Sequence, residues 1–217
     1  MFTLQGMATV LRACLFSCIA ATFFNQPTIA RVGHIPVVGL YQLKKDGIQQ
    51  SVIWGYNGTL VIAKVANARY DQVFHTSFEE DGTENAAIKA KTGRRVGAGD
   101  TYIIPANQRP IAGTYVLSYW KWNGSSWIPA EQTVNYTPSN APLLGLPAGT
   151  IVDEIRLHPK EARMVTFTYD PLVGKISEMD AAGVPIYYEY DEHNRLKFIL
   201  DQDRNVVKSY YYHYKAN

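Results

Sequence analysis

Three tryptophans in the middle of the chain are the side chains best suited to binding chemistry. Trp120 and Trp122 are two positions apart, so on an extended strand they share one face, with Tyr119 on the other. Trp127 follows the hairpin signal Asn123-Gly124 and is expected to return beside the first strand. Exposed aromatic rings can stack on sugars, whereas buried ones pack in cores. The candidate carbohydrate-binding residues are therefore Tyr119, Trp120, Trp122 and Trp127, with core packing as the alternative.

The remaining polar residues give no catalytic pattern. Asp153 and Glu154 are adjacent on a strand predicted over residues 149–158, so they are expected on opposite faces, which is a poor arrangement for glycoside hydrolysis. The sequence contains no G-x-S-x-G, phosphate-binding-loop or dinucleotide-binding motif. The 5 histidines are scattered without metal-ligand spacing. We therefore expect a protein that is not an enzyme.

The elements that carry these residues are predicted to be short strands. The 217 residues are 47% apolar, which is enough for a core, and the net charge of +2 without a dense Lys/Arg run argues against a nucleic-acid partner. Asn57-Gly58 and Asn123-Gly124 are hairpin signals, and no segment after residue 30 has convincing helical periodicity. Many short strands with frequent turns indicate an all-β chain with a β-sandwich.

Residues 1–30 are expected to be either a signal peptide or a mispredicted leader. The uncharged run over residues 13–24 suits the apolar core of an export signal. It is too short for a transmembrane helix, which needs about 20 residues, so no transmembrane span is expected. Both cysteines lie in this segment, and the remainder therefore has no cysteine-ligated zinc site.

The last third of the chain repeats with a period of 21 residues. Tyr169-Asp170 recurs as Tyr190-Asp191, Asp180 recurs as Asp201, and Tyr190 recurs as Tyr211. A fixed period in this range indicates a stacked-repeat architecture, which is usually a scaffold.

Residues 165–214 resemble the YD repeats of the Rhs family, whose unit is similar to YD-x-x-G-R-L-x-x-x-x-D-x-x-G followed by a tyrosine-rich strand. The matching positions are Tyr169, Asp170, Asp180, Gly183, Tyr190, Asp191, Arg195, Leu196 and Asp201. Residues 51–70 also resemble a segment of large Rhs-like secreted proteins of the Bacteroidetes type. This resemblance implies antiparallel hairpins that pair with other YD-repeat segments.

Two positions depart from the repeat pattern. Asn194 stands where the unit has its first glycine, and Arg204 where it has its second. Asn enters the left-handed region at modest cost, so the first turn is expected to survive. At the second turn, Asn205 is expected to replace the glycine instead of Arg204.

Residues 74–158 are similar to galactose-binding-like, jelly-roll carbohydrate-binding modules, through Ser77-Phe78-Glu79 at the start and residues 152–159 (VDEIRLHP) at the end. In such modules an acidic residue near the start and an aspartate on the last strand often share a structural calcium ion. The resemblance places these ligands at Glu79 and Asp153, and calcium prefers such oxygen ligands. A solvated edge pair is the alternative.

The sequence thus predicts a leader over residues 1–30, an Rhs-like hairpin segment over 31–73, a jelly-roll-like sandwich over 74–160 and two YD repeats over 161–217. The expected function is a structural or adhesive part of a bacterial surface or secreted protein. A carbohydrate-binding module that binds a polysaccharide through the sandwich tryptophans is the alternative. No cofactor is expected apart from the calcium ion.

Overall fold

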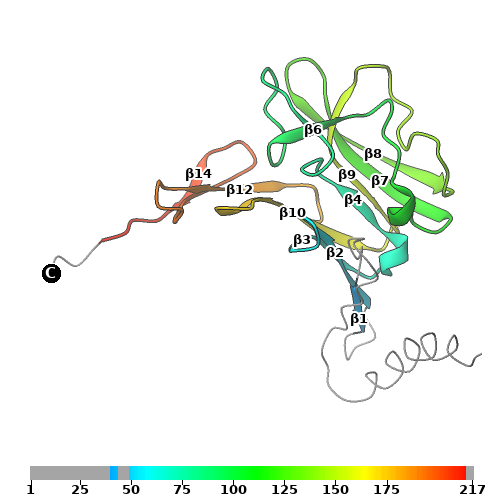
Figure 1. The fold of residues 1–217 in the computed structure, drawn as a ribbon, viewed down its shortest axis with the longest axis horizontal. Coiled ribbons are helices and arrows are strands. Elements are labelled where there is room, and N and C mark those ends of the chain that lie inside the picture. The colour runs from blue at the N-terminus through cyan, green and yellow to red at the C-terminus, as the bar shows by residue number, and fades with distance from the viewer. Residues whose placement is uncertain (1–39, 44–48, 214–217) are drawn as a thin grey trace, which may run out of the picture.

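The computed structural model of the protein describes residues 40–43 and 49–213. Within these ranges the chain is almost entirely antiparallel β-structure in two sheets, with two short 3-10 turns, η1 (Tyr70–Gln72) and η2 (Ala106–Gln108) (Figure 1). The prediction of an all-β chain is confirmed. None of the described segments forms a helix long and apolar enough to cross a membrane.

The first sheet contains eight of the described strands, ordered along the sheet as they occur in the chain. From one edge to the other they are β1 (Leu40–Leu43), β2 (Gln49–Gly55), β3 (Leu60–Ala66), β10 (Arg163–Asp170), β11 (Gly174–Met179), β12 (Pro185–Tyr190), β13 (Leu196–Leu200) and β14 (Val206–Ser209).

The second sheet contains the six described strands between Phe74 and His158. Its main path is β5 (Thr83–Glu84), β6 (Arg95–Ala98), β9 (Ile151–His158), β7 (Gly113–Trp122) and β8 (Trp127–Tyr136), and β4 (Phe74–Thr76) also pairs with β9.

A pairing between two strands that are far apart in the chain joins the two halves of the first sheet. β3 pairs with β10 in antiparallel register, from Ala66 opposite Arg163 to Ala63 opposite Thr166. A small core accompanies this pairing, in which Val65 and Met164 are 1% exposed. The segments 31–73 and 161–217, expected as separate units, therefore contribute to one sheet, and the second sheet is inserted between them.

The inserted segment forms one sheet, not the two that a jelly roll would need. Its inner face packs against its own loops, through a core that includes Phe74, Leu117 and Ile155 and through Ile104 and Leu144 from the loops. Its other face meets the first sheet at β10 and β11. The two-layer arrangement thus combines the inserted sheet with the flanking one (Figure 1).

A bulge in β9 changes which side chains share a face. Glu154 has a φ of 52°, and the register of β9 against β7 shifts there, so that Asp153 lies opposite Trp120 and Arg156 lies opposite Ser118. Because Ser118 and Trp120 share a face of β7, Asp153 and Arg156 share a face of β9. The expectation that Asp153 and Glu154 face opposite ways was therefore wrong: both bond to Thr92.

The local predictions had mixed outcomes. The hairpin signals are confirmed, because Asn57-Gly58 joins β2 to β3 and Asn123-Gly124 joins β7 to β8. Residues 101–104 form an irregular segment, in which Ile104 packs into the core. The leader over residues 1–30 lies outside the described residues.

Candidate functional site

The hairpin turns after β11, β12 and β13 are built in the same way around Asp180, Asp191 and Asp201. In each turn the main-chain N–H of the aspartate donates to the carbonyl four positions later, at 2.9–3.0 Å, and its own carbonyl accepts the N–H three positions later, at 3.0–3.1 Å. Its Oδ1 also accepts two main-chain N–H groups, at 2.8–3.0 Å. The same turn geometry therefore recurs after each of these strands, at about half of the 21-residue sequence period.

Each turn also has one residue in the left-handed region, three positions after the aspartate. These residues are Gly183 (φ 81°), Asn194 (φ 58°) and Arg204 (φ 67°). The expectation for Asn194 is confirmed, but the expectation that Asn205 replaces the second glycine was wrong. The guanidinium carbon of Arg204 lies 3.4 Å from the centroid of the Tyr187 ring, a contact that offsets part of the backbone cost.

Tyrosines tie successive hairpins to their neighbours. The hydroxyl groups of Tyr169, Tyr190 and Tyr212 donate to main-chain carbonyls on β3, β11 and β13, at 2.9, 2.8 and 2.8 Å. The 21-residue period matched Tyr190 with Tyr211, but Tyr211 is 81% exposed and Tyr212 makes the equivalent bond. The tyrosine spacing therefore lengthens by one residue at the last hairpin.

Two further residues that match the predicted repeat form ion pairs. Arg195, just before the start of β13 at Leu196, lies with its Nη2 2.6 Å from Asp191 Oδ2. The side-chain hydrogen bond from Arg195 lowers the pKa of Asp191 from 3.8 to about 2. Asp170 pairs with Arg94 of the inserted segment at 2.5 Å. One of these ion pairs therefore stabilises a turn, and the other joins the first sheet to the inserted segment.

Of the four candidate sugar-binding residues, the three tryptophans lie on one face of β7 and β8, and Tyr119 lies on the other face. Tyr119 is 7% exposed and belongs to the core of the second sheet. Trp122 and Trp127 are directly opposite each other on β7 and β8, with ring centroids 5.6 Å apart, and Trp127 Nε1 donates to Lys89 O. Trp120 is half-buried beneath the ammonium group of Lys91, which lies 4.0 Å from its centroid.

The residues proposed for calcium have other partners. Glu79 Oε1 accepts the main-chain N–H groups of Arg94 and Arg95 at 2.8 and 2.9 Å, and Asp153 accepts those of Thr92 and Glu154. Among residues 40–43 and 49–213, no group of three or more His, Cys, Asp or Glu side chains is placed to hold a metal ion. Main-chain amides thus donate hydrogen bonds to both carboxylates, and the calcium site stays a prediction.

A buried polar cluster joins the two sheets, and the sequence interpretation missed it. Glu154 is 1% exposed and accepts the hydroxyl groups of Thr92 and Thr166 at 2.7 and 2.8 Å. Arg156 donates to Thr166 Oγ1 at 2.7 Å and to Asp180 O at 2.8 Å, and its Nε lies 3.5 Å from Glu154 Oε2. The signal in the sequence was the charge density of residues 153–156 inside an otherwise apolar strand.

A pocket of about 580 Å³ opens beside this cluster. It is lined by Trp120, Glu131, Arg156 and His158 of the second sheet and by residues 181–184, the turn between β11 and β12. Burial lowers the pKa of His158, which keeps its ring neutral near pH 7. The pocket thus offers one aromatic wall together with both donors and acceptors of hydrogen bonds.

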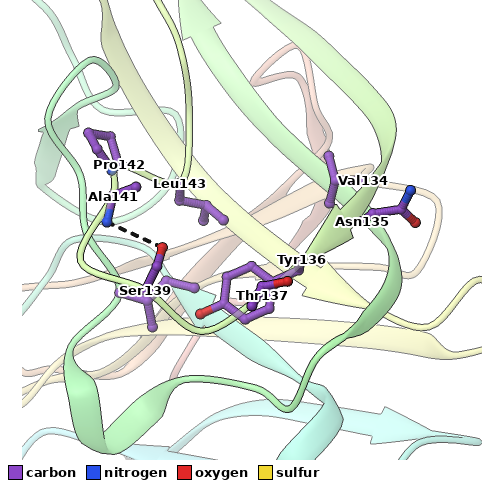
Figure 2. Close-up of a pocket in the computed structure, with 9 residues that line it drawn as sticks. Val134, Asn135, Tyr136, Thr137, Ser139, Ala141, Pro142 and Leu143 are labelled. Atoms are coloured by element: carbon purple, nitrogen blue, oxygen red, sulfur yellow. Dashed lines mark hydrogen bonds between the residues drawn. The ribbon is translucent and has the colours of Figure 1, made fainter.

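Figure 2 shows a second, smaller pocket of about 180 Å³ at the end of β8. Its lining includes Val134, Tyr136 and Leu143, and Ser139 Oγ accepts the N–H of Ala141 across its rim. No Asp, Glu, Lys, Arg or His side chain lines it, so this pocket offers no charged group for catalysis or ion binding.

No protein family, curated protein or solved structure was found to match this chain.

Proposed function

We propose that the protein is a non-enzymatic structural or adhesive part of a bacterial Rhs-like YD-repeat protein, secreted or at the cell surface. The observation that carries the proposal is the identical hydrogen-bond pattern of the turns at Asp180, Asp191 and Asp201. A unit that repeats its geometry along a sheet can continue the sheet with further units of the same kind. The partner of this chain is then another YD-repeat segment.

The outer edge of β14 supports this choice of partner. Val206, Val207, Lys208 and Ser209 are all exposed, and β14 ends the first sheet among the described strands. Tyr210 N donates to Lys197 O on β13, and N–H groups alternate in direction along a strand, so the N–H of Ser209 points away from β13. An incoming strand would accept this hydrogen bond.

The test is self-association of the full chain, because each copy carries the hairpins of residues 165–213 in folded form. The full chain should bind a labelled second copy, and Ser209→Pro should weaken this association because it removes the outward N–H. Ser209→Ala keeps the N–H and is the matched control. Sedimentation of the labelled chain with unlabelled chain measures the association. A chain that stays monomeric at about millimolar concentration, or equal loss in both variants, would refute the proposal.

The alternative is a carbohydrate-binding module, and the position of Trp120 in the 580 Å³ pocket favours it. Trp120→Ala should then abolish binding on a glycan array, while the folded state persists by circular dichroism. Trp122→Ala is the control, because Trp122 lies outside the lining of that pocket. Absence of binding by the wild-type chain to any glycan would exclude this alternative.

A further inference from the structure

Two hairpins of the described chain carry the same reactive dipeptide. Asn57-Gly58 joins β2 to β3, and Asn123-Gly124 joins β7 to β8. An asparagine that precedes a glycine can close a five-membered imide ring, because the missing Cβ of glycine lets its main-chain nitrogen approach the side-chain amide. Asparagine is therefore one of the thermolabile residues of proteins. The two turns present this chemistry in two different settings within one molecule.

The turn at Asn57 keeps the attacking nitrogen engaged. The N–H of Gly58 donates to Gly55 O at 3.0 Å, and the N–H of Asn57 donates to Glu80 Oε1 at 3.1 Å. The nitrogen of Gly58 must lose its proton before it can attack, so its hydrogen bond has to break first. Ring closure at Asn57 therefore requires local opening of the turn.

The turn at Asn123 leaves the attacking nitrogen free. The N–H of Gly124 donates no hydrogen bond to any of the described residues, and residues 123–126 are all exposed, so water can take its proton. The turn itself is closed by the bond from the N–H of Asn123 to Ser126 O at 3.1 Å. The nitrogen of Gly124 can therefore be deprotonated while the turn stays folded.

The side-chain amide of Asn123 is also polarised by its neighbours. Its Oδ1 accepts the main-chain N–H groups of Ser125 and Ser126 at 2.9 and 2.8 Å, and the hydroxyl group of Ser125 at 3.1 Å. When a nitrogen adds to an amide carbon, negative charge develops on the amide oxygen, and donors that are already in place around it stabilise this charge. This turn thus combines a free nucleophile with a polarised electrophile.

We propose that Asn123 is a site of spontaneous deamidation, in which the nitrogen of Gly124 attacks the side-chain amide. The bond from Gly124 N to Asn123 Cγ forms and the bond from Cγ to Nδ2 breaks. The proton of Gly124 N passes through water to Nδ2, which leaves as ammonia. A second water then opens the imide: cleavage at Cγ gives aspartate, and cleavage at the main-chain carbonyl carbon gives isoaspartate. Water is the sole co-reactant, and the proposal does not depend on the repeat function.

The two products differ in their effect on the hairpin. Aspartate keeps the oxygen that accepts the N–H groups of Ser125 and Ser126, and its charge strengthens these bonds. Isoaspartate adds a methylene group to the main chain within the turn, and the register of a hairpin depends on its turn. Trp122 and Trp127 form the first pair after this turn, so isoaspartate should displace them from their direct opposition.

The test is peptide mapping of the full chain by mass spectrometry during incubation in mildly alkaline buffer. Conversion of amide to carboxyl should be about tenfold faster at Asn123 than at Asn57, because only Asn57 must first break a hydrogen bond of its glycine. Unfolding in guanidinium chloride should accelerate conversion at Asn57 by about the same factor and change that at Asn123 by less than about twofold. Equal rates at the two sites in the folded chain, or equal acceleration of both by unfolding, would overturn the proposal.

Asn123→Asp supplies the aspartate product without the isoaspartate. This variant should unfold at the same denaturant concentration as fresh wild type, because the turn keeps its acceptor oxygen. Wild type aged until Asn123 has been converted should unfold at a lower concentration, in proportion to the isoaspartate measured by electron-transfer fragmentation. An aged chain that contains isoaspartate and is as stable as Asn123→Asp would refute the predicted change in the hairpin.

Discussion

Side chains as different as glycine, asparagine and arginine occupy the same left-handed position in three successive turns. For an L-residue this conformation costs roughly 1–2 kcal/mol. Arg204 remains there because the N–H groups of its two neighbours donate to Asp201 Oδ1 and its guanidinium group stacks on Tyr187. The backbone geometry of these turns is therefore set by the aspartate, and the left-handed residue adapts to it.

Gly183→Ala should lower the free energy of unfolding by about 1 kcal/mol. A Cβ at this position would meet no atom within 4 Å, so the cost comes from the φ of 81° alone. Gly145→Ala is the matched control, because a Cβ there also meets nothing and the backbone is not left-handed. Urea unfolding measures both variants, and equal stabilities would contradict the explanation from backbone strain.

The low pKa of Asp191 predicts a loss of stability in acid. In the unfolded chain its pKa is about 3.9, whereas the folded value is about 2. Its contribution is therefore complete above about pH 4 and is lost as the pH falls through about 2. A carbon-13 titration of the Asp191 carboxyl group should show a midpoint near 2. A midpoint near 4 in the folded protein, or an unchanged acid slope in Asp191→Asn, would contradict this.

At the scale of the elements, β9 is the strand that fastens the inserted sheet to the first one. Its bulge brings Asp153, Glu154 and Arg156 to one side, and Arg156 reaches the carbonyl of Asp180 in the turn between β11 and β12. A buried charge pair is weak evidence for net stability, but removal of one partner leaves the other as an unpaired buried charge. The pair therefore fixes how the two sheets meet.

Arg156→Met should lower the free energy of unfolding by about 3–5 kcal/mol, because Glu154 is left as an unpaired buried charge. The double variant Arg156→Met with Glu154→Gln should recover part of this loss. Arg163→Met, on the exposed start of β10, is the control and should change stability by less than about 0.5 kcal/mol. Denaturant unfolding of these three variants and the wild type gives the comparison, and a double variant no more stable than Arg156→Met would contradict the pairing.

The sequence predicted what depends on neighbouring residues. Asn57-Gly58 and Asn123-Gly124 are local turn signals, and the regular spacing of the aspartates followed from the repeat. The bulge at Glu154 was not predictable in this way, because strict alternation places Asp153 and Glu154 on opposite faces. The pairing of β3 with β10 left no signal in either strand, since any apolar strand could have closed the sheet.

Over the whole molecule, the first sheet depends on strands from both ends of the described chain. Removal of residues 1–73 should abolish hydrogen-exchange protection across β10–β12, because β10 loses its partner β3 and most of the small core that accompanies their pairing. Removal of residues 206–217, which takes away only the edge strand β14 among the described strands, should leave that protection in place. Persistent protection of β10 in the first truncation would show that the hairpins fold alone.

The separation of β3 and β10 along the chain also determines how long β3 waits for its partner during synthesis. At about 5–20 residues per second, a ribosome needs roughly 5 to 20 s to make residues 67–162, which separate Ala66 from Arg163. Throughout that interval the nascent chain presents β3 as an open edge, while the inserted sheet is still being completed. The segment that completes the sheet emerges only after this interval, so nascent chains on one messenger can exchange their β10 strands before each has completed its own sheet.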